Sequence, residues 1–358
     1  MNKRKAFLSG RFVCYLLLVF TLKVGAQTPV TIAHRLLALE QAFSHTSSAQ
    51  FHKQEQILNN LMTAAQKRIH LEQNVKTLRP DQVQHLFLQI DSVLAEQGFF
   101  TCIQVEFLSQ CLNKTSVTQL DCRLQPSTAY RQQQLALKDS VYKMDCDIGS
   151  MLYMSIAQTL HLPVFMVEVP KHNFVRWQFA DGSVFNWDVN EAKCFSNDMY
   201  RRGLTTASYL GFDSISEKRF NYLSNLDTTQ ILGYYAYVLG RNYKRSHNYA
   251  AAEFYYSFSI SKLPAHPLPK MCLAYLLTFH QSPKNKSELE RANQLALEAA
   301  SCCPQENVYL ETLACSYARL GRYDEALLTL QQSTKAKPEL IQAFKNKKTG
   351  LEVYRPVD

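Results

Sequence analysis

Three residues in the middle of the chain carry side chains that together could form a nucleophilic site. Cys146 precedes a long apolar stretch, His172 opens an alternating stretch, and Asp188 ends a third short run. A cysteine thiolate attacks carbonyl carbon, and a histidine can accept the thiol proton and later return it. A carboxylate beyond the histidine fixes its tautomer and stabilises the imidazolium. The residue types and their order predict a catalytic triad for acyl transfer.

The residues around these three predict the elements that position them. From Met151 onward the chain is strongly apolar, so a helix with Cys146 at its N-terminal end is expected, ending near Pro163. The positive end of the helix dipole would favour the thiolate and lower the pKa of Cys146. Apolar and alternating patterns then predict three strands, at residues 164–169, 172–179 and 184–188.

Each residue of this set also has a simpler interpretation. A cysteine is commonly a small buried hydrophobic residue, and a strand histidine commonly has a structural partner. Asp188 could be a turn residue, with Asn186 as its rival for orienting His172. Asp145 and Asp147 flank the thiol, where carboxylates would raise its pKa, although both also suit a helix N-terminus. The order of the three residues along the chain favours the triad.

The first 26 residues have the layout of a secretory signal peptide. Basic residues between Met1 and Lys5 precede an apolar run at 12–22, and small residues end at Ala26. The run is too short for a membrane-spanning helix, and Cys14 lies too early in it for a lipoprotein attachment site. No later stretch is long and apolar enough to span a membrane. The sequence predicts cleavage after Ala26 and export to the periplasm or the extracellular space.

Removing this segment changes the charge and the cysteine count. It takes away five basic residues and no acidic one, so the formal net charge falls from +9 to +4. A cluster of lysines at 335–348 is typical of a solvated helical tail, and nucleic acid is not an expected partner. The ten cysteines become nine, an odd number that leaves at least one thiol unpaired within the chain. Their spacing fits no zinc site, so neither a metal nor a cofactor is expected.

The C-terminal third contains three copies of one pattern, with a period of about 34 residues. Small residues alternate with large ones at matching positions, and each copy ends at a proline. The middle copy has six extra residues within 281–287, and Ala296 stands where the other copies have Tyr256 and Leu330. The copies contain Leu239-Gly240, Tyr243, Tyr249, Ala252, Tyr256 and Pro264; Leu273-Ala274, Leu277, Ala292, Ala299 and Pro304; and Leu313-Ala314, Tyr317, Gly321, Tyr323, Ala326, Leu330 and Pro338. This pattern resembles the tetratricopeptide repeat, which implies an all-α solenoid that binds a protein or peptide.

Residues 144 to about 200 resemble the transglutaminase-like superfamily, and in particular its bacterial members that are followed by tetratricopeptide repeats. The resemblance depends on Cys146 with Leu152-Tyr153-x-x-Ile156-Ala157, on Leu162-Pro163-Val164, on Val169-Pro170-x-His172-x-Phe174-Val175-Arg176-Trp177, and on Asn186-Trp187-Asp188. Upstream, Ile90-x-x-Val93-Leu94 resembles the lead-in helix of that group. The resemblance implies a papain-like α+β core, with Cys146 as nucleophile, His172 as general base and acid, and Asp188 as orienting residue. Related proteins often have Gly or Asn before the nucleophile, where this chain has Asp145.

These patterns divide the chain into five segments. They are a signal peptide at 1–26, a helical lead-in at 27–100, the transglutaminase-like core at 101–225, the repeats at 226–340 and a tail at 341–358. The expected function is that of an exported thiol enzyme acting on a carboxamide, as a peptidase, a deamidase or an acyl transferase, with the repeats docking a partner. The alternative is a non-catalytic envelope protein that binds partners through a degenerate cleft and the repeats.

Overall fold

The computed structural model describes residues 30–44, 46–71, 74–102, 105, 107–120, 128–203, 211–280 and 285–351. The expected signal peptide and Cys122 lie outside these ranges, as does most of the inserted segment at 281–287. The chain divides into two compact units. Unit 1 contains the described residues up to Asp213 together with Leu223–Thr228, and unit 2 contains Ser214–Tyr222 and the described residues from Thr229. None of the helices in the described ranges is long and apolar enough to cross a membrane.

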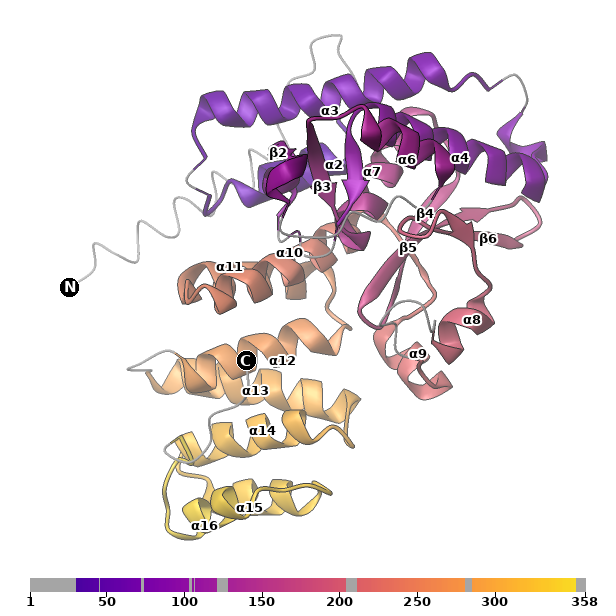
Figure 1. Cartoon of the computed structure of the whole chain (residues 1–358). Helices are drawn as coiled ribbons and strands as arrows, with labels where there is room; N and C mark the ends of the chain where they lie inside the picture. The colour runs from indigo at the N-terminus through magenta and orange to yellow at the C-terminus, as the bar shows by residue number, and fades with distance from the viewer. Residues whose placement is uncertain are drawn as a thin grey trace. The chain divides into compact units, whose positions relative to one another are not determined.

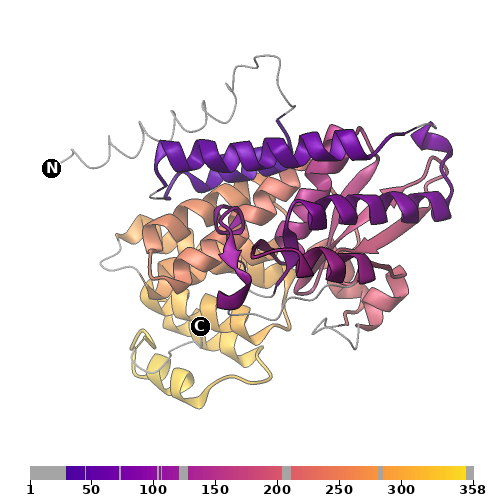
Figure 2. The same ribbon diagram turned by 45° about the horizontal axis from the view of Figure 1, so that its top comes forward.

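Unit 1 contains a layer of long helices that packs on a central helix. The outer helices are α2 (Ile32–Glu40), α3 (Ser48–Arg68) and α4 (Pro80–Glu96), and the central one is α7 (Cys146–Thr159). Both α2 and α3 contact α7, and α3 also contacts α4 (Figures 1 and 2). Shorter helices are α5 (Leu108–Cys111), α6 (Ala129–Ala136) and α8 (Asn197–Arg202), with 3-10 turns at Val75–Thr77 and Val117–Gln119.

Two sheets complete unit 1. The smaller has the order β1-β3-β2, from β1 (Phe99–Thr101), β2 (Thr115–Ser116) and β3 (Ser140–Met144). The larger is antiparallel with the order β7-β6-β5-β4-β8, and α7 packs on its strands β4 and β5. Its strands are β4 (Val164–Val169), β5 (His172–Gln178), β6 (Val184–Asp188), β7 (Lys193–Cys194) and β8 (Asn225–Leu226).

The three strands predicted from the sequence are therefore present, and only β5 ends one residue earlier than expected. Val169 pairs with His172, so the connection between β4 and β5 is a tight turn at Pro170-Lys171. Lys171 has a φ of 61°, which such a turn requires. This turn places His172 at the very start of β5, at one end of the sheet.

A buried ion pair joins the helices of unit 1 to α7. Arg131 in α6 donates to Asp91 in α4, and both side chains are almost completely buried. Asp91 also accepts from the hydroxyl of Tyr153 in α7 at 3.0 Å, and Arg131 donates to the carbonyl of Phe99 at 3.1 Å. Two ions that are removed from water need such partners to be tolerated. The pair therefore fixes α7 relative to α4, α6 and β1.

The two tryptophans belong to the core of unit 1. Trp187 is completely buried and stacks on Phe87 of α4, with ring centroids 5.6 Å apart. Trp177 is 1% exposed. The sheet is thereby packed against α4 by large apolar side chains.

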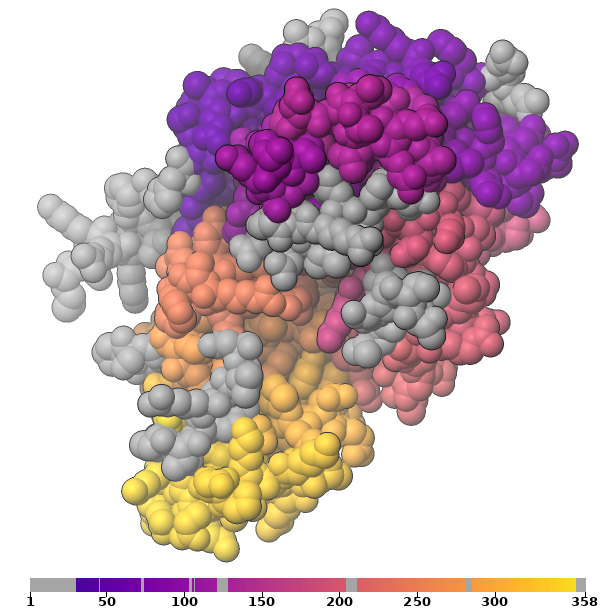
Figure 3. Space-filling view, in the orientation of Figure 1, coloured from indigo at the N-terminus to yellow at the C-terminus, as the bar shows by residue number. Residues whose placement is uncertain are grey.

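In the described residues, unit 2 contains α9 (Ser214–Phe220), three helix pairs and a last helix. Figure 1 shows the pairs as successive layers. Figure 3 shows one face of these helices in space-filling form, in orange and yellow. The pairs are α10 (Thr228–Arg245) with α11 (Tyr249–Lys262), α12 (Pro267–Phe279) with α13 (Lys286–Cys302), and α14 (Asn307–Arg319) with α15 (Tyr323–Gln331), followed by α16 (Pro338–Lys345). Each pair coincides with one copy of the sequence pattern.

The small residues of the pattern lie where helices approach closely. A Cβ atom at Gly240 of α10 would lie 2.6 Å from the ring of Tyr256 in α11, closer than side chains can pack. Ala252, Ala292 and Ala326 are completely buried. The alternation of small and large residues is thus explained by helix-to-helix packing within unit 2.

We expect replacement of Arg131 by Met to destabilise unit 1 by about 3–5 kcal/mol, because it leaves the Asp91 carboxylate buried without its counter-ion. Urea unfolding followed by circular dichroism measures this change. The matched control is Arg79→Met, which removes an exposed ion pair with Asp81 and should alter the unfolding midpoint little. Equal effects of the two substitutions would contradict the role of the buried pair.

Candidate active site

Cys146 is the first residue of α7, and the preceding residue caps this helix. Asp145 accepts a hydrogen bond from the backbone N–H of Ile148 at 2.9 Å, as an N-cap aspartate does. One turn into the helix, a Cβ atom at Gly149 would lie 2.9 Å from Val189. The glycine therefore lets the first turn of α7 approach the residue that follows Asp188. This contact brings the cysteine end of the helix to the end of β6.

His172 and Asp188 form a buried hydrogen bond. In the pairing of β5 with β6, Val175 lies opposite Trp187, and continuing this register places Asp188 opposite Phe174. Since side chains two residues apart share a face of a strand, His172 and Asp188 lie diagonally on one face. Their side chains meet there, with Nε2 of His172 2.7 Å from Oδ2 of Asp188.

Three further donors hold the Asp188 carboxylate in place. Oδ1 accepts from the backbone N–H groups of Asn190 and Glu191 at 3.0 and 3.1 Å, in the turn that follows β6. Oδ2 also accepts from the hydroxyl of Tyr200 in α8 at 3.2 Å. These hydrogen bonds satisfy both oxygens of the Asp188 side chain, which has no contact with water. Asp188 therefore fixes the orientation of the His172 ring, and Nδ1 is the ring nitrogen on its other side.

Asn186, the alternative orienting residue, has a different role. Its side-chain oxygen accepts from Nε of Arg176 at 2.7 Å, and its amide donates to the carbonyl of Phe195 at 2.9 Å. Arg176 also donates to the carbonyl of Leu223, and burial lowers its pKa to about 10. Asn186 and Arg176 thus connect β5 and β6 with the segments that cover the sheet, while His172 is held by Asp188.

Cys146 is a free cysteine, and its thiol contacts Asp147 and the backbone of Asn173. Its sulfur lies 3.9 Å from Oδ1 of Asp147, a weak contact. The backbone amide of Asn173, the residue after His172, lowers the pKa of the thiol by hydrogen bonding. The Asn173 side chain donates to the same Asp147 oxygen. The structure thus places Cys146 next to the start of β5, where His172 lies.

The pKa of Cys146 is nevertheless raised well above the usual value for a thiol. Burial is the largest cause, followed by the charges of Asp147 and Asp145, and Asp188 adds to them. The prediction of a lowered pKa from the helix dipole was therefore wrong. The first turn of α7 is packed too closely, and surrounded by too many carboxylates, for the dipole to dominate.

Two buried carboxyl groups of unit 1 have raised pKa values. Burial and the charge of Asp147 raise the pKa of Asp145 to about 8, and the same two causes raise that of Glu168 in β4 to about 8. At pH 7 the carboxyl groups of Asp145 and Glu168 are therefore mostly neutral. As the pH passes 8, Asp145 adds negative charge that acts on the Cys146 thiol.

Sequence reasoning missed the contributions of Asn173 and Glu168. Both are ordinary strand residues by their pattern, and Asn173 lies one position from His172, on the opposite face of the strand. Only the packing of α7 on β4 and β5 brings them to Cys146 and Asp147. Within the described ranges, no group of three or more His, Cys, Asp and Glu side chains is arranged to hold a metal ion.

Comparisons of the chain with protein-family models, with curated proteins and with solved structures found no match. The functional interpretation therefore depends on the residues and their geometry. That geometry includes a buried His172–Asp188 pair and a free thiol at a helix N-terminus, which contacts the backbone of the residue after His172.

Replacement of Asp147 by Asn should increase the alkylation rate of Cys146 at pH 8. The charge of Asp147 is the second-largest cause of the raised thiol pKa, after burial, and the substitution removes it. Each unit by which the pKa falls allows up to about tenfold faster reaction. The measurement is the rate of iodoacetamide labelling of Cys146, followed by mass spectrometry. Asp181→Asn, in an exposed turn, is the control and should leave the rate unchanged. An unchanged rate in Asp147→Asn would contradict this electrostatic interpretation.

Replacement of Glu168 by Gln should make the stability of unit 1 less dependent on pH. The pKa of Glu168 rises from 4.5 to about 8 on folding, so its contribution is complete below pH 4.5 and is lost as the pH rises through 8. One such group changes the unfolding free energy by at most about 1.4 kcal/mol per pH unit. Urea unfolding at pH 5, 6.5 and 8 measures the slope. A Glu168→Gln variant with the parental slope would show that this carboxyl ionises freely in the fold.

Proposed function

We propose that this chain is an exported thiol enzyme of the transglutaminase-like type, which acts on a carboxamide through Cys146, His172 and Asp188. The observation that carries the proposal is the buried hydrogen bond of 2.7 Å between His172 and Asp188, next to a free thiol at the start of α7. A histidine oriented by a carboxylate beside a nucleophile is the arrangement that general acid–base catalysis needs.

In the proposed reaction, Sγ of Cys146 attacks the carbonyl carbon of the carboxamide. The thiol proton passes to Nδ1 of His172, and the positive imidazolium is stabilised by Asp188 through Nε2. Collapse of the tetrahedral intermediate breaks the C–N bond, and His172 gives its proton to the leaving amine or ammonia. The product of this half-reaction is a thioester on Cys146.

The raised pKa of the thiol decides how the first step proceeds. At neutral pH Cys146 is protonated, so a stable thiolate is not present before the substrate arrives. His172 must therefore remove the proton while the sulfur–carbon bond forms, as a general base. This makes the proposed reaction more dependent on His172 than that of an enzyme whose thiol is already ionised.

The second half-reaction determines the type of enzyme. Water attacking the thioester, with His172 as base, gives a peptidase or a deamidase, and regenerates the thiol. An amine attacking in the same way gives acyl transfer and a new amide bond. The same three residues serve both outcomes, so the substrate and the acceptor distinguish them.

Three features support the wider proposal. The helix that begins at Cys146 and the antiparallel strands that follow it have the element order of the proposed α+β transglutaminase-like core. The helix pairs of unit 2 support tetratricopeptide-like repeats that dock a protein or peptide partner. Cys102 is disulfide-bonded, which suits a protein exported to an oxidising compartment.

A second candidate function is that of a binding protein that has lost catalysis. The raised pKa of Cys146 and its contact with Asp147 favour this alternative, because both stabilise the unreactive thiol. In this case the cleft and the repeats would hold a partner without altering it. The two candidates differ in whether Cys146 forms a covalent bond with a substrate.

The proposal predicts that the chain modifies carboxamides in a mixture of peptides supplied with a primary amine. Mass spectrometry detects deamidation, cleavage and amine attachment in one experiment. Cys146→Ser should abolish the modification because it removes the nucleophile, and His172→Ala should abolish it because it removes the general base. Asp188→Asn should lower it by about 10²–10⁴-fold, because an amide cannot maintain the required tautomer.

The matched control is Cys194→Ser, which removes an exposed free thiol of β7 and should leave the modification unchanged. Circular dichroism of each variant shows whether it folds. A peptide mixture that the parent protein leaves unaltered, or a Cys146→Ser variant that is as active as the parent, would contradict the enzyme and favour the binding protein.

A further inference from the structure

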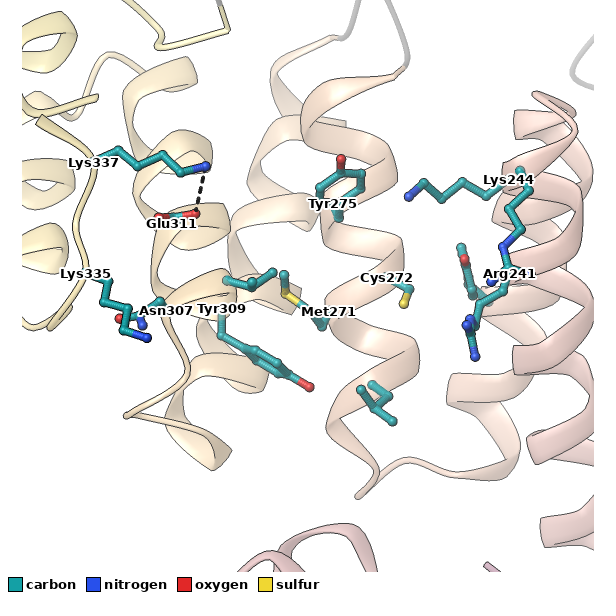
Figure 4. A pocket seen from close by; sticks show the side chains of 14 residues that line it. Arg241, Lys244, Met271, Cys272, Tyr275, Asn307, Tyr309, Glu311, Lys335 and Lys337 are labelled. Carbon is teal, nitrogen blue, oxygen red and sulfur yellow. Dashed lines mark ion pairs between the residues drawn. The ribbon is translucent and has the colours of Figure 1, made fainter. Parts of the chain in front are cut away.

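Unit 2 contains a cavity of about 590 Å³, which we call the unit 2 cavity. Figure 4 shows Arg241 and Lys244 of α10 on one side, and Lys335 and Lys337, from the segment before α16, on the other. Arg245 also lines it. This volume lies within the range of about 300–1,000 Å³ that is usual for ligand sites. The cavity belongs to a part of the molecule with no role in the proposed thiol chemistry.

The charges around the cavity are strongly unbalanced. Five basic side chains line it, and Glu311 is the one acidic residue among them. Glu311 is nearly buried and lies 4.0 Å from Lys337. On the other side, the ammonium group of Lys244 lies 4.5 Å from the centre of the Tyr275 ring, which directs the lysine toward the cavity. The cavity is therefore complementary to a ligand with negative charge at two separated positions.

The space between the two basic groups is apolar. Met271 and Tyr275 of α12 lie there with Tyr309 of α14 (Figure 4). The other residues of the lining without charge are Tyr256, Leu268, Cys272, Asn307 and Val308. An inorganic anion would gain nothing from these side chains. A ligand that places an apolar group between two charges would contact both the basic residues and this floor.

Two tyrosine hydroxyls in the lining have no hydrogen bond to nitrogen or oxygen within the described residues. Tyr256 is completely buried and Tyr309 is 7% exposed, and the hydroxyl oxygens of both lack a hydrogen-bond partner. The thiols of Cys272 and Cys303 are their nearest polar neighbours, and thiols are weak partners. The two hydroxyls are therefore buried beneath the cavity surface, with thiols as their neighbours, and the tyrosine rings contribute to the apolar lining.

We propose that the unit 2 cavity binds an acidic peptide segment in which an apolar side chain stands between acidic residues. The carboxylates pair with Arg241 and Lys244 at one end and with Lys335 at the other. The apolar side chain lies on Met271 and on the tyrosine rings of the lining. A nucleic acid fits less well, because its phosphates bind to a continuous basic stripe. The unit 2 cavity instead has two basic groups that are separated by an apolar floor.

The probe for the test is a fluorescein-labelled peptide with one leucine between two pairs of glutamates, titrated with the full chain in fluorescence anisotropy. A peptide with glutamine at the four acidic positions is its neutral counterpart. We expect the acidic peptide to bind at least tenfold more tightly, and increasing salt to weaken it. Arg241→Glu and Lys335→Glu should each reduce its affinity about tenfold or more, whereas Glu311→Gln should increase it.

The matched controls are Lys286→Glu and Lys345→Glu, which reverse exposed charges of unit 2 outside the cavity lining. Neither should change the affinity by more than about twofold. Equal affinity for the acidic and neutral peptides, or equal effects of the cavity and control substitutions, would overturn the proposal. Displacement of the peptide by a single-stranded oligonucleotide or by anionic lipid vesicles at lower concentration than by unlabelled peptide would overturn it in favour of those ligands.

Discussion

The burial of the Asp188 carboxylate determines the arrangement of its surroundings. A carboxylate removed from water requires compensating hydrogen bonds, and this one accepts from His172, from Tyr200 and from the backbone of Asn190 and Glu191. These donors come from β5, from α8 and from the turn after β6. Loss of any of these donors would leave the Asp188 carboxylate without part of its hydrogen bonding. β5, α8 and the turn after β6 are therefore held around this carboxylate. The orientation of the His172 ring is a consequence of this constraint.

The packing that brings the thiol to this pair also suppresses its ionisation. Gly149 allows α7 to approach Val189 at a distance that no larger residue could, and this close contact removes water from the first turn of the helix. Burial then raises the pKa of Cys146, and Asp147 raises it further. The site therefore combines a well-oriented base with a thiol whose pKa is raised. Under the proposed mechanism, Asp188 stabilises the imidazolium that forms when His172 takes the thiol proton.

The sequence predicted the local elements well because short-range patterns determine them. The apolar run after Cys146, the tight turn before His172 and the short strand that ends at Asp188 are all readable from neighbouring residues. Neighbouring residues do not decide whether Asp188 or Asn186 orients His172. That choice depends on the register of β5 with β6, which places Asn186 opposite Arg176. The pKa of the thiol depends in addition on how closely α7 packs on the sheet. No neighbouring residue encodes that distance.

The Cys146 site and the unit 2 cavity differ in the sign of their charge. The net charge of the chain does not reveal this difference. Asp147 and Asp188 lie near the thiol, whereas five basic residues surround the unit 2 cavity. An acidic peptide segment is therefore attracted to the cavity and repelled from Cys146, so one segment cannot satisfy both sites. If both proposals hold, a partner that is held by an acidic segment must present a different, neutral or basic, segment to the thiol. The carboxamide that reacts is then selected by a sequence other than the one that docks.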